Sequence, residues 1–202
     1  MSSSRIAIVD AGGANIASLR FALARLGHDA ELTAEPTVIR AASHVILPGV
    51  GAAQDAMQRL KASGLNELIT DLDQPVFGIC LGMQLLFEGS EEEQAECLGI
   101  LPGVARRFAP EPGRPVPHMG WNRVFRNAPS SLFDGIPDGA QFYFVHSYAL
   151  PVGKFTTGSC EYGQPFSAAV QKDNYFATQF HPERSGRHGA RLLENFLRLR
   201  GD

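Results

Sequence analysis

The stretch QPVFGICLGMQLLF, residues 74–87, decides how the chain folds, because it joins a strand to a helix through a cysteine. Residues 76–79 form a short apolar run behind a proline, which is typical of a strand buried on both faces of a sheet. Residues 83–87 have the pattern of the start of a helix. Gly78 and Gly82 flank Cys80, and because glycine has no Cβ, the strand can reverse sharply into the helix there.

A nucleophile on such an elbow projects from a strained turn, and the backbone N–H of the next residue, Leu81, can bind an oxyanion. The positive end of the helix would favour a thiolate over a thiol at Cys80. The same pattern also fits a small cysteine buried between two packing glycines. The elbow alone does not decide between the two interpretations, and the distant segment His181-Pro182-Glu183 does.

Strands and helices alternate upstream of the elbow. Strands are expected at 6–9, 30–33 and 45–47, and helices over 16–26 and 52–60. This order predicts a doubly wound, mostly parallel sheet with right-handed crossovers. In such sheets ligands bind beyond the carboxyl ends of the strands. We therefore expect the loop Pro48-Gly49-Val50-Gly51 and Cys80 to lie across one crevice.

The first strand is followed by a glycine turn at 11–14, with Asn15 as a plausible helix cap. Its glycines do not follow the G-x-G-x-x-G order of dinucleotide-binding folds, so a nucleotide site is not favoured.

The second half predicts an antiparallel C-terminal extension of the sheet, with strands at 141–149, 167–171 and 175–178. Ser185 is expected to cap a final helix that packs on the sheet through four apolar residues, Leu192, Leu193, Phe196 and Leu197. Because no linker intervenes, we expect a single domain over 1–202.

Composition narrows the class of protein. The 202 residues are 44% hydrophobic, enough for a sizeable core, and the net charge of −3 argues neither for nor against nucleic acid. No apolar run reaches the length of a membrane span, and residues 1–5 lack the apolar region of a signal peptide. Cys80, Cys97 and Cys160 show no C-x-x-C spacing, so neither a zinc site nor a disulfide scaffold is expected. These features predict a reduced cytoplasmic protein.

His181 and Glu183 complete a candidate catalytic site. They are two residues apart at the end of a predicted strand, so their side chains point the same way while Pro182 stiffens the link. A cysteine nucleophile needs a base, and a histidine base needs an acceptor that fixes its tautomer. Together with the elbow, the segment predicts a Cys80-His181-Glu183 triad, and Cys97 and Cys160 are expected to be structural.

Residues 104–126 carry five arginines against one glutamate, and four prolines. The prolines predict an extended loop over the sheet. The charges fit a solvated surface or a partner contact. The only tryptophan, Trp121, lies within the run, and a single tryptophan is more often a core residue than an interface anchor.

The segments GICLGMQ (78–84) and FHPE (180–183) resemble the class I, or triad, glutamine amidotransferases over nearly the whole chain. The resemblance implies a flavodoxin-like fold with no metal or organic cofactor. Further features are similar to the branch of this family that serves imidazole glycerol phosphate synthases: a length without a synthase domain, PGVG (48–51), HMGWN (118–122) and YFVHSY (143–148). The turn DAGGAN (10–15) departs from the family's Asp-Tyr-Gly-x-Gly-Asn.

The resemblance also implies roles for individual residues. The oxyanion hole would be formed by Leu81 with the loop residues Gly49, Val50 and Gly51. The substrate would be bound by Gln84, by an acid among residues 91–93, here taken as Glu92, and by His146, Ser147 and Tyr148. A synthase (cyclase) subunit with a (β/α)8 barrel would form a heterodimer with this chain and receive the ammonia. The contacts to it would be made by Asn15, His118, Trp121, Asn122 and Arg123.

Three alternatives remain open from the sequence. The chain could be the amidotransferase subunit of another pathway, such as those leading to pyridoxal phosphate or anthranilate. It could be a cysteine peptidase or a γ-glutamyl hydrolase that uses the same elbow. It could be a non-catalytic scaffold, although a scaffold has no need of a thiol, an imidazole and a carboxylate together.

Overall fold

The computed structural model describes residues 5–12 and 16–200, so the predicted cap Asn15 and the second half of the turn before it lie outside the described residues. Its centre is a mixed sheet with the following spatial order: β2 (Ala30–Thr33), β1 (Ile6–Val9), β3 (His44–Gly49), β4 (Val76–Cys80), β13 (Tyr175–Thr178), β12 (Gln164–Lys172), β11 (Thr156–Tyr162), β8 (His118–Arg126) and β9 (Ala140–His146). The strands from β2 to β13 pair in parallel, and those from β13 to β9 pair antiparallel. The predicted fold class is confirmed.

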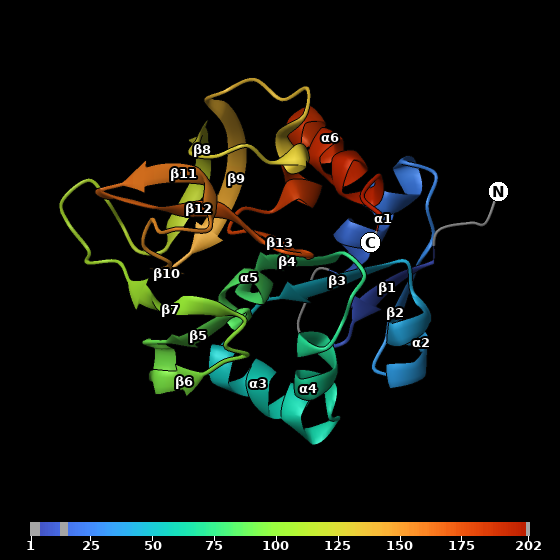
Figure 1. Ribbon diagram of the computed structural model, residues 1–202. Helices are drawn as coiled ribbons and strands as arrows, with labels where there is room; N and C mark the ends of the chain where they lie inside the picture. The colour runs from blue at the N-terminus through green and yellow to red at the C-terminus, as the bar shows by residue number, and fades with distance from the viewer. Residues whose placement is uncertain (1–4, 13–15, 201–202) are drawn as a thin grey trace.

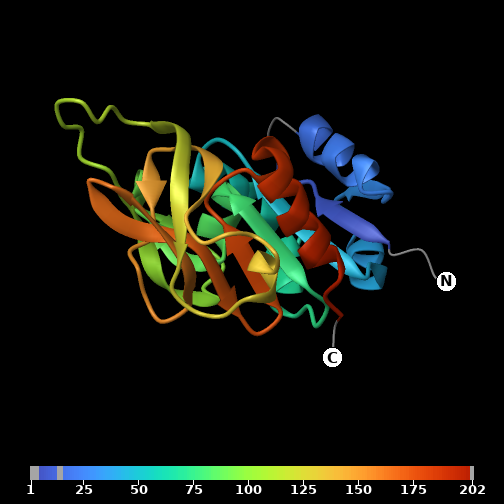
Figure 2. The same ribbon diagram turned by 90° about the horizontal axis from the view of Figure 1, so that it is seen from above.

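Helices cover both faces of the parallel half, as Figures 1 and 2 show. One face packs against α1 (Ile16–Arg25) and α6 (Gly186–Leu197), and the other against α2 (Pro36–Ala41), α3 (Ala53–Ala62) and α4 (Leu65–Thr70). Alternate strand residues divide between the two cores: Ile6 and Ile8 face α1, while Ala7 and Val9 face the opposite layer. All four are buried, which explains the continuous apolar runs of these strands.

Three sequence predictions need correction. The helix after the elbow, α5, spans only Leu81–Leu85, because Phe87 already begins strand β5 (Phe87–Ser90). Most of the region predicted as an extended loop is strand, β7 (Leu101–Arg107) and β8, and the prolines lie in the connection between them. The third correction is that the second half is not wholly antiparallel, since β13 pairs in parallel with β4.

A smaller sheet lies beside the elbow. Its spatial order is β10 (Tyr148–Ala149), β7, β5 and β6 (Ala95–Glu96), and the 3-10 turn η1 (Glu92–Gln94) follows β5. Two further 3-10 turns, η2 (Ser131–Phe133) and η3 (Pro182–Arg184), lie against α6. Among the described residues, no helix is long and apolar enough to cross a membrane.

Candidate active site

Cys80 occupies a strained elbow at the carboxyl end of β4. Its backbone has φ 54° and ψ −109°, a conformation that a residue with a side chain rarely adopts. The reversal depends on close backbone contact, because a Cβ at Gly82 would lie 1.8 Å from the carbonyl oxygen of Leu47. A Cβ at Gly78 would lie 2.8 Å from the carbonyl oxygen of Gly82. The glycine spacing around Cys80 therefore has a steric cause in the structure.

His181 and Glu183 come to the elbow from the neighbouring strand. β13 runs parallel to β4, with Thr178 opposite Ile79, so the segment after β13 emerges beside Cys80. His181 Nδ1 and Glu183 Oε1 are 2.9 Å apart, and their side chains are 6% and 4% exposed. Burial disfavours the imidazolium ion, but the interactions with Cys80 and Glu183 outweigh it and raise the pKa of His181 to about 10. The arrangement favours a protonated His181 beside the sulfur.

The backbone of His181 is fixed by strand β9. The N–H of His181 donates to Tyr143 O at 2.9 Å, and Ser185 Oγ donates to His181 O at 2.7 Å. Ser185 Oγ also accepts from Tyr143 N at 2.9 Å. Ser185 lies at the start of α6 as predicted, but its side chain makes no cap hydrogen bond and instead holds the loop that carries the histidine.

A cavity of about 260 Å³ opens over Cys80. The described side chains that line it include most of those predicted for catalysis and substrate binding: Val50, Gly51, Cys80, Leu81, Gln84, Glu92, His146, Ser147, Tyr148 and His181. Among the three predicted acids, Glu92 is the one that lines the cavity. Its Oε2 accepts a hydrogen bond from Ala53 N at 3.0 Å, at the start of α3.

The loop predicted to complete an oxyanion hole lies directly beside the elbow. Gly49 is the register partner of Cys80 across β3 and β4. A Cβ at Gly49 would lie 2.9 Å from the Cβ of Leu81, so only glycine allows this approach. Gly51, two residues on, has φ +97°, which also favours glycine. The structure thus brings Gly49, Val50 and Gly51 next to Leu81.

His118 was expected at a partner interface, and the structure corrects this. The side chain is 3% exposed and its Nδ1 lies 3.0 Å from His146 Nε2. Burial lowers the pKa of His118 to about 4 and that of His146 to about 3, so both rings are neutral at pH 7. His146 Nδ1 faces the carbonyl oxygen of Tyr148 at 2.8 Å and must donate there. His118 Nδ1 must then donate to His146 Nε2.

The other described residues predicted at the interface differ in exposure. Trp121 is 54% exposed and Arg123 is exposed, whereas Asn122 is half-buried and donates to Glu161 O at 2.9 Å. Trp121 meets the ring of Tyr143 edge-on at 6.0 Å, and the Arg184 guanidinium lies 4.4 Å from the centre of the same ring. The sequence did not predict this cluster, in which the exposed Trp121 and Arg184 contact the half-buried ring of Tyr143.

The arginines of the run 104–126 are not one free basic surface. Arg126 donates to the carbonyl oxygen of Ile136, and Arg114 contacts the carboxylate of Glu111. Arg123 is exposed and lies two residues after Trp121 on strand β8.

One buried residue at the site was missed in the sequence. The side-chain amide of Gln179 donates to Cys80 Sγ at 3.6 Å and accepts from Gln84 Nε2 at 3.0 Å. The signal was present, because Gln179, His181 and Glu183 alternate at a spacing of two.

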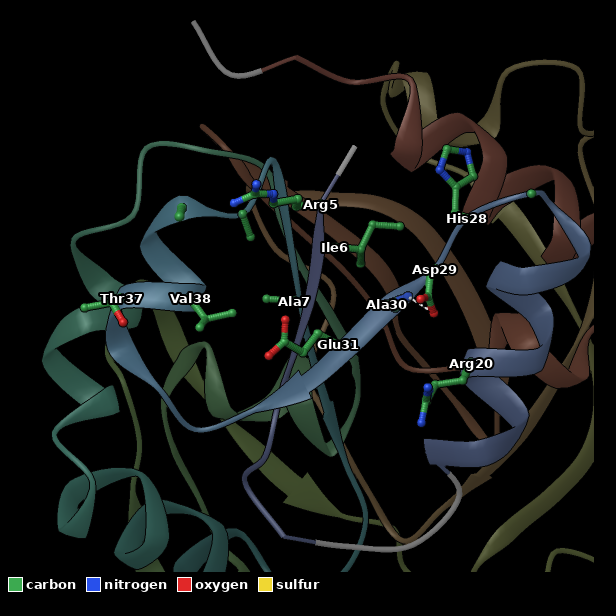
Figure 3. A pocket seen from close by; sticks show the side chains of 13 residues that line it. Arg5, Ile6, Ala7, Arg20, His28, Asp29, Ala30, Glu31, Thr37 and Val38 are labelled. Carbon is green, nitrogen blue, oxygen red and sulfur yellow. Dashed lines mark hydrogen bonds between the residues drawn. The ribbon is translucent and has the colours of Figure 1, made fainter. Parts of the chain in front are cut away.

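A larger groove of about 1070 Å³ lies elsewhere (Figure 3). Arg5, Asp29 and Glu31, at the amino ends of β1 and β2, line it together with Arg20 of α1. Substrates of doubly wound sheets bind at the carboxyl ends, so this groove is not the catalytic site. Within the described residues, no group of three or more His, Cys, Asp or Glu side chains could hold a metal ion.

Comparison with known proteins gives one consistent family. The model of the class I glutamine amidotransferase domain matches residues 7–199. The imidazole glycerol phosphate synthase subunit HisH of Xanthomonas axonopodis pv. citri (strain 306) is 52% identical over 194 residues, covering 96% of this chain and 97% of that protein. The protein of the same name from Escherichia coli (strain K12) is 51% identical over 195 residues, covering 96% and 99%.

Solved structures agree on the fold. A crystal structure of a glutamine amidotransferase has a TM-score of 0.73 at 19% identity, covering 95% of this chain and 96% of that one. A glutamine amidotransferase from Thermotoga maritima has a TM-score of 0.67 at 18% identity, covering 97% and 83%.

Proposed function

Since this chain belongs to the class I glutamine amidotransferase family, we propose that it is the glutaminase subunit of an imidazole glycerol phosphate synthase. In this role it hydrolyses glutamine to glutamate and passes the ammonia to a cyclase subunit. The observation that carries the proposal is the cavity lined by both Cys80 and His181, with Glu183 2.9 Å behind His181 Nδ1. The assignment to an imidazole glycerol phosphate synthase, rather than to another amidotransferase, is supported by the names of relatives that are about half identical over nearly the full length.

In the acylation step, the Cys80 thiolate attacks the side-chain carbonyl carbon of glutamine. A carbon–sulfur bond forms and the carbonyl electrons move to the oxygen. The carbon–nitrogen bond then breaks as His181 gives its proton to the leaving ammonia. The raised pKa of His181 keeps this proton in place at neutral pH. Glu183, on the other ring nitrogen, holds the tautomer and stabilises the imidazolium ion.

Hydrolysis of the γ-glutamyl thioester completes the cycle. His181, now neutral, takes a proton from water, and the hydroxide attacks the thioester carbon. The sulfur leaves as a thiolate and glutamate is released. The backbone N–H of Leu81 and one N–H from the Gly49–Gly51 loop stabilise the oxyanion in both steps. Loss of one such donor costs about 3 kcal/mol in comparable sites, a rate factor of about a hundred or more.

The cavity supports specific substrate contacts. The carboxylate of Glu92 suits the α-ammonium group of glutamine, and one of its oxygens is already held by Ala53 N. Both Nε2 hydrogens of Gln84 are committed to Tyr148 O and Gln179 Oε1, so Gln84 would contact substrate as an acceptor, through Oε1. His146, Ser147 and Tyr148 would form the opposite wall.

The partner would dock on the exposed face of β8 and β9. Met119 is 63% exposed and Trp121 54%, and their register partners on β9 are Val145 and Tyr143. Large exposed apolar and aromatic side chains grouped on one face are typical of a protein interface. This face borders the cavity, because Val145 also lines it. Ammonia released there would pass to a cyclase subunit without crossing bulk solvent.

We also propose that the partner switches the glutaminase on through the peptide between Gly49 and Val50. Next to a glycine the peptide plane can rotate at modest cost, so its N–H can point away from the oxyanion at rest and toward it in the complex. A donor aimed wrongly is equivalent to a donor removed. Cavities of about 10 and 20 Å³ next to Pro48, Gly49 and Val50 leave some room for this motion.

Co-purification with a candidate cyclase subunit, followed by glutaminase assays with and without the cyclase ligand, tests the proposal. A stable complex and stimulation by orders of magnitude are expected. If the lone chain is as active as the ligand-bound complex, the switch does not exist. If no cyclase subunit binds, the pathway assignment is wrong.

The same assays separate the other candidates. A preference for γ-glutamyl peptides over free glutamine would indicate a γ-glutamyl hydrolase. Ammonia transfer only to a synthase of the pyridoxal phosphate or anthranilate pathway would indicate a different amidotransferase subunit.

A further inference from the structure

Gln179 is a completely buried polar residue that lies between Cys80 and Gln84 in the candidate active site. Its exposure is 0%, and it lies directly after β13 and two residues before His181. Its backbone N–H donates to Ala168 O at 2.9 Å, which continues the β12–β13 ladder. A side-chain amide at this depth is stable only where its oxygen and its nitrogen both have partners.

The partners of Gln179 fix the orientation of its amide. Tyr148 O can only accept, so the group of Gln84 that faces it at 3.0 Å must be the NH2 group. The second hydrogen of that group reaches Gln179 at 3.0 Å, where it needs an acceptor, so Gln179 Oε1 must face Gln84. The NH2 group of Gln179 is therefore turned toward Cys80 Sγ, at 3.6 Å. A chain of hydrogen bonds that begins at a backbone carbonyl thus aims a donor at the sulfur.

The second contact of Cys80 Sγ favours the thiol over the thiolate. Cys80 Sγ lies 3.7 Å from Val145 O, a contact that the thiol makes as a donor and that is lost when the proton leaves. The bond from Gln179 persists and becomes charge-assisted, which makes it stronger. Such a donor favours the charged form of the group it contacts. The other charged groups at the sulfur are His181 and, behind it, Glu183, since burial keeps His146 neutral.

We propose that Gln179 is a fourth residue of the catalytic machinery, whose side-chain N–H groups hold Cys80 Sγ and stabilise the thiolate before it attacks. The inference rests on the proposed glutaminase function and adds a residue to it. Gln179 does not line the cavity, so its loss acts on the nucleophile rather than on glutamine binding. The competing role is purely structural, namely to satisfy Gln84.

Alkylation of Cys80 by iodoacetamide over a range of pH tests this without glutamine. Burial raises the pKa of Cys97 to about 11 and that of Cys160 to about 12, so neither thiol competes near neutral pH. A Cys80→Ser variant, which should take up no label, verifies this. Gln179→Met removes the donor at similar volume. Gln179→Glu keeps an acceptor for Gln84, replaces the donor, and places a negative charge beside the sulfur.

Both Gln179 variants should move the midpoint of the alkylation profile up by about one pH unit or more, a tenfold lower thiolate fraction. kcat for glutamine should fall at least about tenfold, with KM little changed. Gln171→Met, which removes an amide from the neighbouring strand β12, should leave the midpoint unchanged.

An unchanged midpoint in both Gln179 variants that retain the wild-type circular dichroism spectrum would overturn the inference. It would leave the proposed function intact if wild-type glutaminase activity still depends on Cys80. If glutaminase activity survives in Cys80→Ser, the proposed function itself fails, whatever the alkylation profile shows.

Discussion

At the scale of single residues, His181 and Glu183 have different roles in one proton transfer. His181 must stabilise the thiolate and protonate the leaving ammonia, whereas Glu183 only orients and stabilises His181 through the 2.9 Å contact. His181→Ala should therefore lower kcat/KM by about a thousandfold or more, close to the loss in Cys80→Ala. Glu183→Gln, which keeps shape but not charge, should be milder, about a hundredfold. Steady-state kinetics with glutamine in the stimulated complex measures both. A Glu183→Gln variant at the wild-type rate would reduce the triad to a Cys–His pair.

The neutral pair His118–His146 makes stability sensitive to acid. Both histidines are protonated in the unfolded chain below about pH 6.5, while burial lowers their pKa in the fold to about 4 and about 3. The unfolded state therefore binds more protons, and the free energy of unfolding falls as pH drops from about 6.5 toward 4. Well below pH 6.5, His181 adds nothing to this slope, because it is protonated in the unfolded chain and its raised pKa keeps it protonated in the fold.

Each histidine contributes a slope of at most about 1.4 kcal/mol per pH unit. Urea unfolding at several pH values should show a shallower slope for His118→Gln than for the wild type, by up to one such increment. Equal slopes in His118→Gln and the wild type would show that the folded pair is already charged.

At the scale of elements, the elbow depends on the approach of α5 to strand β3. Gly82→Ala would place a Cβ 1.8 Å from a backbone oxygen, and a backbone clash cannot be relieved by rotating a side chain. We expect a loss of about 3 kcal/mol or more in unfolding free energy, measured by urea titration, together with loss of glutaminase activity. Gly153→Ala, where no atom lies within 4 Å of the added Cβ, is the matched control and should change little. A stable, active Gly82→Ala protein would contradict the packing described for the elbow.

The elements that could be predicted were those with strong local signals. β1, β2 and β13 matched their predicted ranges, because apolar runs bounded by turns specify buried strands. Helix α2 was missed although Pro36 at its first position is a recognised start signal; with six residues it shows little periodicity. α4 was missed for the same shortness.

Where prediction failed, distant partners decided the structure. Helix α5 ends early because Phe87 pairs with Leu101 in the smaller sheet. β8 forms because β9 and β11 lie on its two sides, and nothing in the local proline-rich sequence shows this. β11 was missed for a related reason, since its ladder with β12 is interrupted at Gly158.

Several residues expected at the candidate site line one cavity, namely Cys80, Glu92, Tyr148 and His181. The elbow motif pointed to Cys80 and the His-x-Glu segment to His181, whereas only the family resemblance pointed to Glu92 and Tyr148. His118 was placed at an interface by the family resemblance, but the pleat of β8 turns it into the core, which the local sequence does not show. Whether a histidine is neutral or charged depends on burial, which the sequence does not show.

At the scale of the whole molecule, large exposed apolar residues lie near both edges of the mixed sheet. Trp121 lies on β8 beside the edge strand β9, near the cavity, and Leu32 lies on β2, the opposite edge. If the β8–β9 face binds the cyclase subunit, Trp121→Ala should weaken the complex by about 2 kcal/mol, a roughly thirtyfold rise in Kd. Leu32→Ala is the control, and calorimetry gives both values. Equal affinities for Trp121→Ala and the wild type would place the interface elsewhere.

The role of Cys80 as the nucleophile is best measured on a complex of the cyclase subunit with Cys80→Ala. Only amide cleavage uses the thiol, and the later chemistry belongs to the partner. This complex should release no glutamate and should show no glutamine-dependent synthesis, while ammonia-dependent synthesis is largely retained. Cys97→Ala and Cys160→Ala should keep both activities. Glutamate release by Cys80→Ala at the wild-type rate would show that Cys80 is not the nucleophile.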